Sequence, residues 1–140
     1  RAAGVLSQCT EPQLESLYHY GRQLGLAFQV VDDILDFTGS EQQLGKPAAS
    51  DLSSGYLTAP ALYALEQNPS LGVLIEREFS NEGDLDEALQ IVRQSDAIAR
   101  TRQLAERFAQ ESREALSWLP ESPSRTALLE LPDFVLSRLY

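Results

Sequence analysis

Apolar residues recur at helical spacing along most of the chain, and no segment shows the two-residue alternation of a β-strand. The longest periodic segment begins at Glu11-Pro12, where proline suits a first helical turn, and ends near Thr38-Gly39. Between Leu24 and Phe37 the apolar residues cover most of the helix circumference, which predicts that this end is buried. The pattern therefore predicts an all-α fold containing one long central helix.

The segment 39–57 breaks this pattern, because it is rich in glycine, serine, alanine and polar residues. It is longer than most connections, and loops of this length in compact domains are often functional. Thr58 is expected to cap the next helix, which ends near Asn68-Pro69. Further helices are expected over 69–79, from Asp84, from Asp96 to Trp118, over 125–131 and over 133–139, with Pro132 separating the last two.

Composition restricts the possible functions. The chain has 140 residues, enough for one domain, and a net charge of −10, which argues against nucleic acid and suits cation binding. No apolar run approaches the roughly 18 residues of a transmembrane helix. Cys9 is the only cysteine, so neither an intrachain disulfide nor a cysteine zinc site is expected, and the cytoplasm is the expected compartment. Because the sequence starts with arginine and lacks methionine, we expect it to be a piece of a longer chain.

The candidate chemistry lies in the stretch FQVVDDILDF, residues 28–37. On a helix Asp32 and Asp36 share one face, and Asp33 lies beside them, so three carboxylates gather on one patch. No lysine or arginine occurs in the sequence between Arg22 and Lys46 to neutralise them. Buried carboxylates must be protonated, paired or bound to metal. The alternative is a solvated acidic stripe on an exposed helix face.

Oxygen ligands at helical spacing favour a hard cation. Mg²⁺ is commonly held by one or two carboxylates together with substrate phosphates. A calcium-binding EF-hand is excluded because its ligands alternate in a glycine-containing loop, and zinc is disfavoured because His19, the only histidine, is over three turns away. Lys46 in a glycine-containing turn is a candidate cation for a diphosphate, although a lone lysine is more often a surface residue.

These residues, with the segments around them, resemble a known family. GRQLGLAFQVVDDILDF, followed by LGKPAASDL and GYLTAPALYALE, resembles the second aspartate-rich region of all-trans polyprenyl diphosphate synthases of the long-chain, solanesyl type. The later EGDLDEALQIVRQSDAIARTRQLAERF and the closing SRTALLELPDFVLSRLY resemble the C-terminal helices of the same enzymes. The resemblance covers residues 1–140 and implies the C-terminal half of a single all-helical domain, with the isoprenoid synthase fold.

The resemblance also implies an activity. In this family Mg²⁺ ions bridge two aspartate-rich motifs to an allylic diphosphate, whose ionised carbon is attacked by isopentenyl diphosphate, and the enzymes are usually homodimers. By the same resemblance Asp32, Asp33 and Asp36 hold metal, with Asp32 the direct contact. Lys46 contacts the allylic diphosphate, Phe28 and Gln29 line the reacting end of the cavity, and Asp51 assists through the metal-bound water.

The sequence departs from the family pattern in two respects. Tyr56 stands where many relatives have lysine, and the first aspartate-rich motif is absent. The chain alone is therefore expected to be inactive and to expose apolar surface. Three other interpretations stay open: a non-catalytic regulatory subunit of a prenyl synthase, a terpene cyclase, and a helical bundle with an incidental acidic patch.

Overall fold

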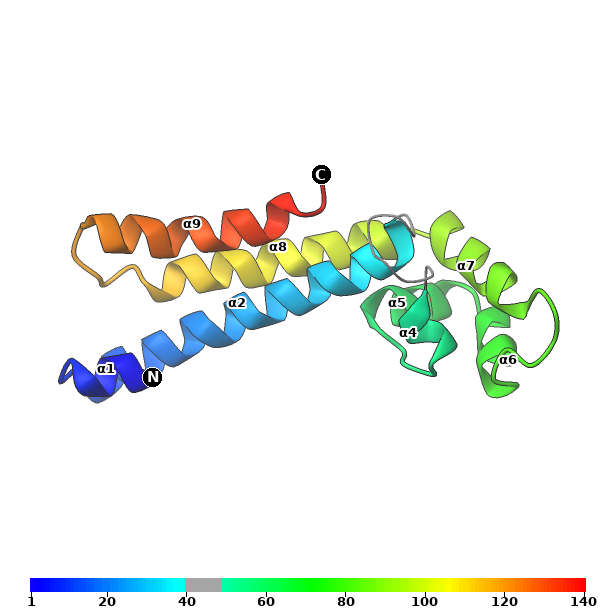
Figure 1. Cartoon of the computed structure of the whole chain (residues 1–140), viewed down its shortest axis with the longest axis horizontal. Helices are drawn as coiled ribbons and strands as arrows, with labels where there is room; N and C mark the ends of the chain where they lie inside the picture. Colours follow the sequence, from blue (N-terminus) through cyan, green and yellow to red (C-terminus); the bar gives the residue numbers. More distant parts are fainter. Residues whose placement is uncertain (40–48) are drawn as a thin grey trace. The chain divides into compact units, whose positions relative to one another are not determined.

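The computed structural model describes residues 1–39 and 49–140, and every regular element within them is a helix. Figure 1 shows their order along the chain. The helices are α1 (Ala2–Leu6), α2 (Glu11–Thr38), α4 (Ser50–Ser53), α5 (Ala59–Gln67), α6 (Ser70–Glu76), α7 (Asp84–Gln94), α8 (Ala97–Ala115) and α9 (Pro123–Ser137). The predicted all-α class is confirmed, and no described helix is long and apolar enough to cross a membrane.

Helix α2 has the bounds that the sequence predicts. In its last two turns Val31, Ile34 and Phe37 are completely buried, and Asp33 and Asp36 are buried as well. Its other face is not buried as the sequence suggests, because the Phe28 side chain remains 46% exposed. The long helix therefore has one buried side and one accessible side.

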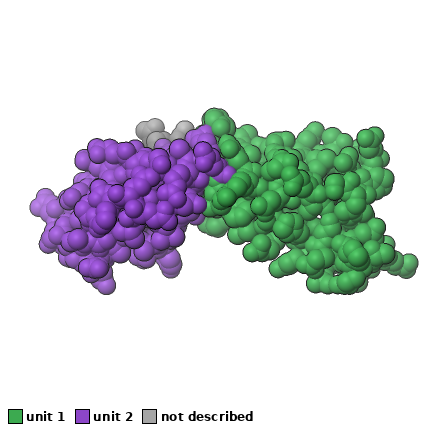
Figure 2. All heavy atoms as spheres, turned by 180° about the vertical axis from the view of Figure 1, so that it is seen from behind, with its two compact units in different colours: residues 1–31, 104–140 green, residues 32–103 purple. Residues whose placement is uncertain are grey.

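The chain divides into two compact units, residues 1–31 with 104–140 and residues 32–103 (Figure 2). In the first unit, polar contacts join α2 to the chain around the end of α8. The Ser16 hydroxyl donates to the carbonyl of Ala115, and Trp118 Nε1 donates to Ser16 Oγ at 2.8 Å. The Gln23 amide donates to the Glu111 carboxylate on α8. These bonds fix the register of α2 against α8.

The sequence predicts two helices separated by Pro132, and this prediction is wrong: α9 is one helix with Pro132 inside it and buried. Proline removes the N–H that would bond to the carbonyl four residues earlier, here that of Leu128. The Tyr20 hydroxyl of α2 donates to that carbonyl at 2.8 Å instead. A contact from another helix therefore supplies a partner for the carbonyl that Pro132 leaves without its usual one.

In the second unit the helices α5, α6 and α7 pack on one another around a common apolar core. Its fully or almost fully buried members are Phe37, Ala49, Leu52, Ala61, Ala64, Leu71, Leu74, Ala88, Val92 and Ala97. The end of α2 and the start of α4 thus contribute to the same core as α5 to α7. This shared core positions the aspartate-rich end of α2.

Two local predictions in this unit are corrected. The segment predicted as a loop over 39–57 contains the short helix α4. Thr58 occupies the capping position of α5, but its side chain accepts no capping hydrogen bond, and its Oγ1 is buried without a partner among the described residues. The helix start is set instead by the extended backbone of Thr58 and by proline in the first turn.

Candidate functional site

The three aspartates of the FQVVDDILDF stretch lie on the last two turns of α2, within the second unit. Their burial differs: the Asp36 side chain is 1% exposed and that of Asp33 is 7% exposed, whereas Asp32 is only partly buried. A ligand arriving from solvent therefore meets Asp32 first.

Asp36 is held by three consecutive residues at the start of α4. The Ser50 hydroxyl donates to Asp36 Oδ1 at 3.0 Å, and the backbone N–H of Asp51 donates to Asp36 Oδ2 at 3.2 Å. The N–H of Ala49 donates to the backbone carbonyl of Asp36 at 2.8 Å. Both carboxylate oxygens of Asp36 therefore already accept hydrogen bonds from the protein.

These bonds bring Asp51 to the aspartate-rich end of α2. Asp51 lies in the first turn of α4 and is partly buried. Lys46, the predicted diphosphate ligand, lies outside the described residues. The structure thus places all four predicted aspartates in one unit. Ser50, which the sequence analysis did not single out, also contacts this group through Asp36.

A cation from a distant helix contacts the same end of α2. Arg93, in the last turn of α7, donates from Nη2 to the carbonyl of Phe37 at 3.3 Å. A positive charge at a helix C-terminus stabilises the helix dipole. The sequence gives no signal for this contact, because Arg93 is 56 positions away from Phe37.

The other two predicted residues on α2, Phe28 and Gln29, are exposed and belong to the first unit. The guanidinium carbon of Arg138, just after α9, lies 4.7 Å from the centroid of the Phe28 ring. This distance is within the range of a cation–π contact. Arg138 was not predicted, and the contact depends on the packing of α9 within this unit.

The chemistry of the donors suits a shared metal site. Within residues 1–39 and 49–140, no three His, Cys, Asp or Glu side chains are arranged to hold one metal ion. His19 is exposed. Mg²⁺ needs only one or two protein carboxylates when phosphate oxygens and water complete its shell, and Asp32, which is only partly buried, fits that requirement.

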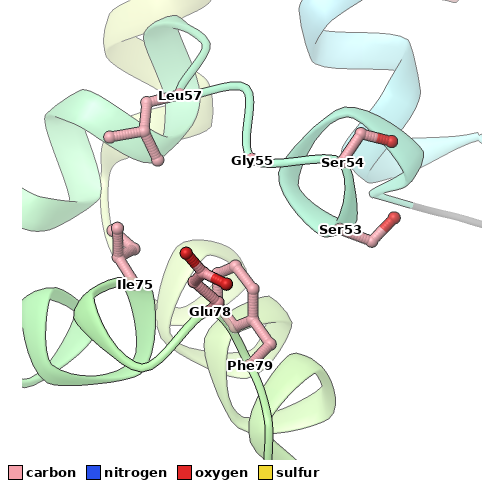
Figure 3. Close-up of a pocket in the computed structure, with 7 residues that line it drawn as sticks. All are labelled: Ser53, Ser54, Gly55, Leu57, Ile75, Glu78 and Phe79. Atoms are coloured by element: carbon pink, nitrogen blue, oxygen red, sulfur yellow. The ribbon is translucent and has the colours of Figure 1, made fainter.

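A separate hollow of about 520 Å³ lies elsewhere in the second unit. Figure 3 shows Leu57 and Ile75 on one side of it and Ser53 and Ser54 across from them. Gly55, Glu78 and Phe79 complete its lining. None of the predicted site residues lines this hollow, so it is distinct from the aspartate-rich end of α2.

Comparison with known proteins gives matches along the whole chain. A family model described as polyprenyl synthetase matches residues 1–92. A prenyl transferase of Synechocystis sp. is 57% identical over all 140 residues, and the chain covers 43% of it. Solanesyl diphosphate synthase 2 of Arabidopsis thaliana, named as chloroplastic, is 45% identical over 139 residues, with 33% of its length covered.

A solved structure has the same fold. The polyprenyl synthase of Caulobacter crescentus, determined with calcium and isoprenyl diphosphate, superposes with a TM-score of 0.86 at 35% identity. The match covers 99% of this chain and 44% of that one. The chain therefore spans less than half the length of the relatives it matches.

Proposed function

The chain belongs to the polyprenyl synthetase family, and we propose that it supplies the second aspartate-rich motif of a Mg²⁺-dependent prenyl transferase. In the proposed reaction isopentenyl diphosphate is condensed onto an allylic diphosphate to give a long-chain polyprenyl diphosphate. The family match over residues 1–92 carries the proposal, because it includes the whole FQVVDDILDF stretch and the segments after it.

The roles proposed for individual residues follow the family motif. Asp32, Asp33 and Asp36 form the aspartate-rich motif, with Asp32 as the direct metal contact. Lys46 binds the allylic diphosphate, and Asp51 assists at the metal-bound water. The exposure of Asp32 supports its role, since it is the most accessible aspartate of the motif.

The bound Mg²⁺ would supply positive charge that stabilises the departing diphosphate. Phe28 and Gln29 would line the reacting end of the prenyl cavity. Both residues are exposed on α2. Asp32 would orient the diphosphate through the metal, and Lys46 would hold it as a point charge.

The wider context is proposed on the same grounds. Residues 1–140 would form the C-terminal half of one all-helical synthase domain, and the complete enzyme would be a homodimer. The cytoplasm stays the predicted compartment, although the solanesyl relative from Arabidopsis thaliana is named as chloroplastic. A non-catalytic regulatory subunit of a prenyl synthase is the second candidate, and a full-length chain whose only D-D-x-x-D motif is that of residues 32–36 would favour it.

The test compares wild type with Asp32→Ala in the full-length protein that carries this sequence. Labelled isopentenyl diphosphate, an allylic diphosphate and Mg²⁺ are supplied, and products are resolved by chain length. We expect Mg²⁺-dependent elongation in wild type and a loss of about 10²–10³-fold in kcat for Asp32→Ala.

The matched control is Asp86→Ala, which removes an exposed aspartate from the first turn of α7. We expect it to keep kcat within about twofold of wild type, as surface substitutions usually do. A well-folded wild type that makes no product would reject the catalytic proposal and favour the regulatory subunit.

A further inference from the structure

The aspartates of the motif are not equivalent in the structure, because Asp36 has the most buried carboxylate of the three. We propose that Asp36 is a positioning residue that anchors the start of α4, and that it does not ligate the metal. This inference rests on the proposed function, since it assigns metal binding to Asp32 and the positioning of α4 to Asp36.

The first argument is the geometry around the carboxylate. Oδ1 accepts the Ser50 hydroxyl at 3.0 Å and Oδ2 accepts the Asp51 N–H at 3.2 Å. The Asp36 side chain is 1% exposed. Each oxygen keeps a further lone pair, but at 1% exposure a hydrated metal ion could reach it only by opening the contact with α4, and the Asp51 N–H would then lose its partner at a cost.

The second argument is what α4 needs at its start. The first N–H groups of a helix lack partners within the helix, and a side chain at the capping position usually supplies one. Here the capping residue is Ala49, whose side chain has no acceptor. Asp36 replaces the missing cap from another helix, because its carboxylate accepts the N–H of Asp51.

The third argument is the backbone strain at Ala49. This residue adopts the left-handed conformation, with φ of 53° and ψ of 37°, and is completely buried. Left-handed backbone is unfavourable for residues other than glycine and persists only where surrounding contacts impose it. The bond from Ala49 N–H to the Asp36 carbonyl, at 2.8 Å, is one such contact.

Asp36 therefore fixes three consecutive residues, the last of which is Asp51. By this route Asp36 sets where Asp51 lies relative to the aspartate-rich end of α2. Loss of the hydrogen bonds to the Asp36 carboxylate should displace Asp51 from its proposed position at the metal-bound water. The metal contact of Asp32 should remain in place.

The kinetic test uses Asp36→Asn, Ser50→Ala and Asp32→Asn in the full-length protein. For a positioning residue, Asp36→Asn raises KM for the allylic diphosphate by about 10-fold. The Mg²⁺ concentration for half-maximal rate should stay within about twofold of wild type, whereas Asp32→Asn should raise it at least about 10-fold. Ser50→Ala should act in the same direction as Asp36→Asn, and the double variant should be no worse than Asp36→Asn alone.

A second readout does not depend on activity. Amide hydrogen exchange of Asp51 should accelerate at least about 10-fold in Asp36→Ala, because this substitution removes the acceptor oxygen, whereas the amide oxygen of Asp36→Asn could still accept the bond. The Ala49 amide is the internal control, since it bonds to the backbone carbonyl that the substitution keeps. Unchanged exchange at Asp51, or a Mg²⁺ requirement shifted as far as in Asp32→Asn, would overturn the proposal. An inactive wild type would reject the proposed function, and the exchange data would still decide the role of Asp36.

Discussion

Asp84 is a buried carboxylate whose environment differs from that of the aspartates on α2. It begins α7 and accepts from Arg77 Nε at 2.8 Å and from the Asn81 N–H at 3.0 Å. The hydrogen bond from Arg77, followed by the Asn81 bond and the charge of Arg77, lowers the pKa of Asp84 below its ordinary value of 3.8, although burial opposes the shift. The pair closes the turn between α6 and α7.

This shift predicts how stability depends on pH. Because the folded pKa of Asp84 lies below the unfolded value, its contribution is complete above about pH 5 and is lost as the pH falls below about 4. Asp84→Asn should therefore be less stable than wild type at pH 7, and the difference should shrink on acidification. Urea denaturation of both proteins at several pH values measures this difference.

The control for that experiment is Asp86→Asn, the same substitution at an exposed position of the same helical turn. Its stability difference from wild type should be small, as for most surface substitutions. It should not follow the acid dependence of Asp84→Asn. A difference between Asp84→Asn and wild type that stays constant from pH 7 to about pH 3 would contradict the assignment.

Sequence information predicts single residues well only where their role is local. The helical spacing of Asp32, Asp33 and Asp36 follows directly from the sequence, and α2 keeps that spacing. The hydrogen bond from Ser50 to Asp36 cannot be predicted from the sequence, because it joins residues 14 positions apart and depends on the tertiary fold. The Arg138 contact with Phe28 depends in the same way on the packing of α9.

Helices are predicted best where both ends carry strong signals. Helix α2 has proline in its first turn and glycine directly after its last residue, and its predicted bounds are confirmed. Helix α9 is the opposite case. An internal proline usually interrupts a helix, so Pro132 leads the sequence analysis to predict two helices where the structure has one. The sequence does not reveal that Tyr20, 108 positions before Leu128, supplies the missing donor.

This contact gives a prediction at the scale of the helix pair. Tyr20→Phe removes the donor and leaves the Leu128 carbonyl without that partner, so the free energy of unfolding should fall by about 1–3 kcal/mol. In a Pro132→Ala background the alanine N–H restores the bond within the helix. The cost of Tyr20→Phe should then be clearly smaller, which a double-mutant cycle by urea denaturation measures. Equal costs in the two backgrounds would show that Tyr20 does not compensate for Pro132.

For the whole molecule, the important fact is that the chain matches less than half of its relatives. Large apolar side chains remain exposed on both units. In the first unit they are Val5, Leu6, Tyr18, Phe28, Leu131, Phe134 and Tyr140, and in the second Tyr56, Leu57, Leu62 and Val73. Exposed apolar surface of this kind often marks a protein interface. In the family that the sequence resembles, metal ions bridge two D-D-x-x-D motifs, and residues 1–140 contain one of them.

We therefore expect the 140-residue chain alone to make no polyprenyl diphosphate and to bind an apolar dye. Adding the part of the Synechocystis relative that lies outside the matched 43% should restore Mg²⁺-dependent elongation and reduce dye binding. The restored activity should disappear when the 140-residue chain carries Asp32→Ala, because in the proposed reaction both motifs hold the metal-bound diphosphate. Elongation by the 140-residue chain alone would contradict this prediction, since it would mean that one aspartate-rich motif is enough.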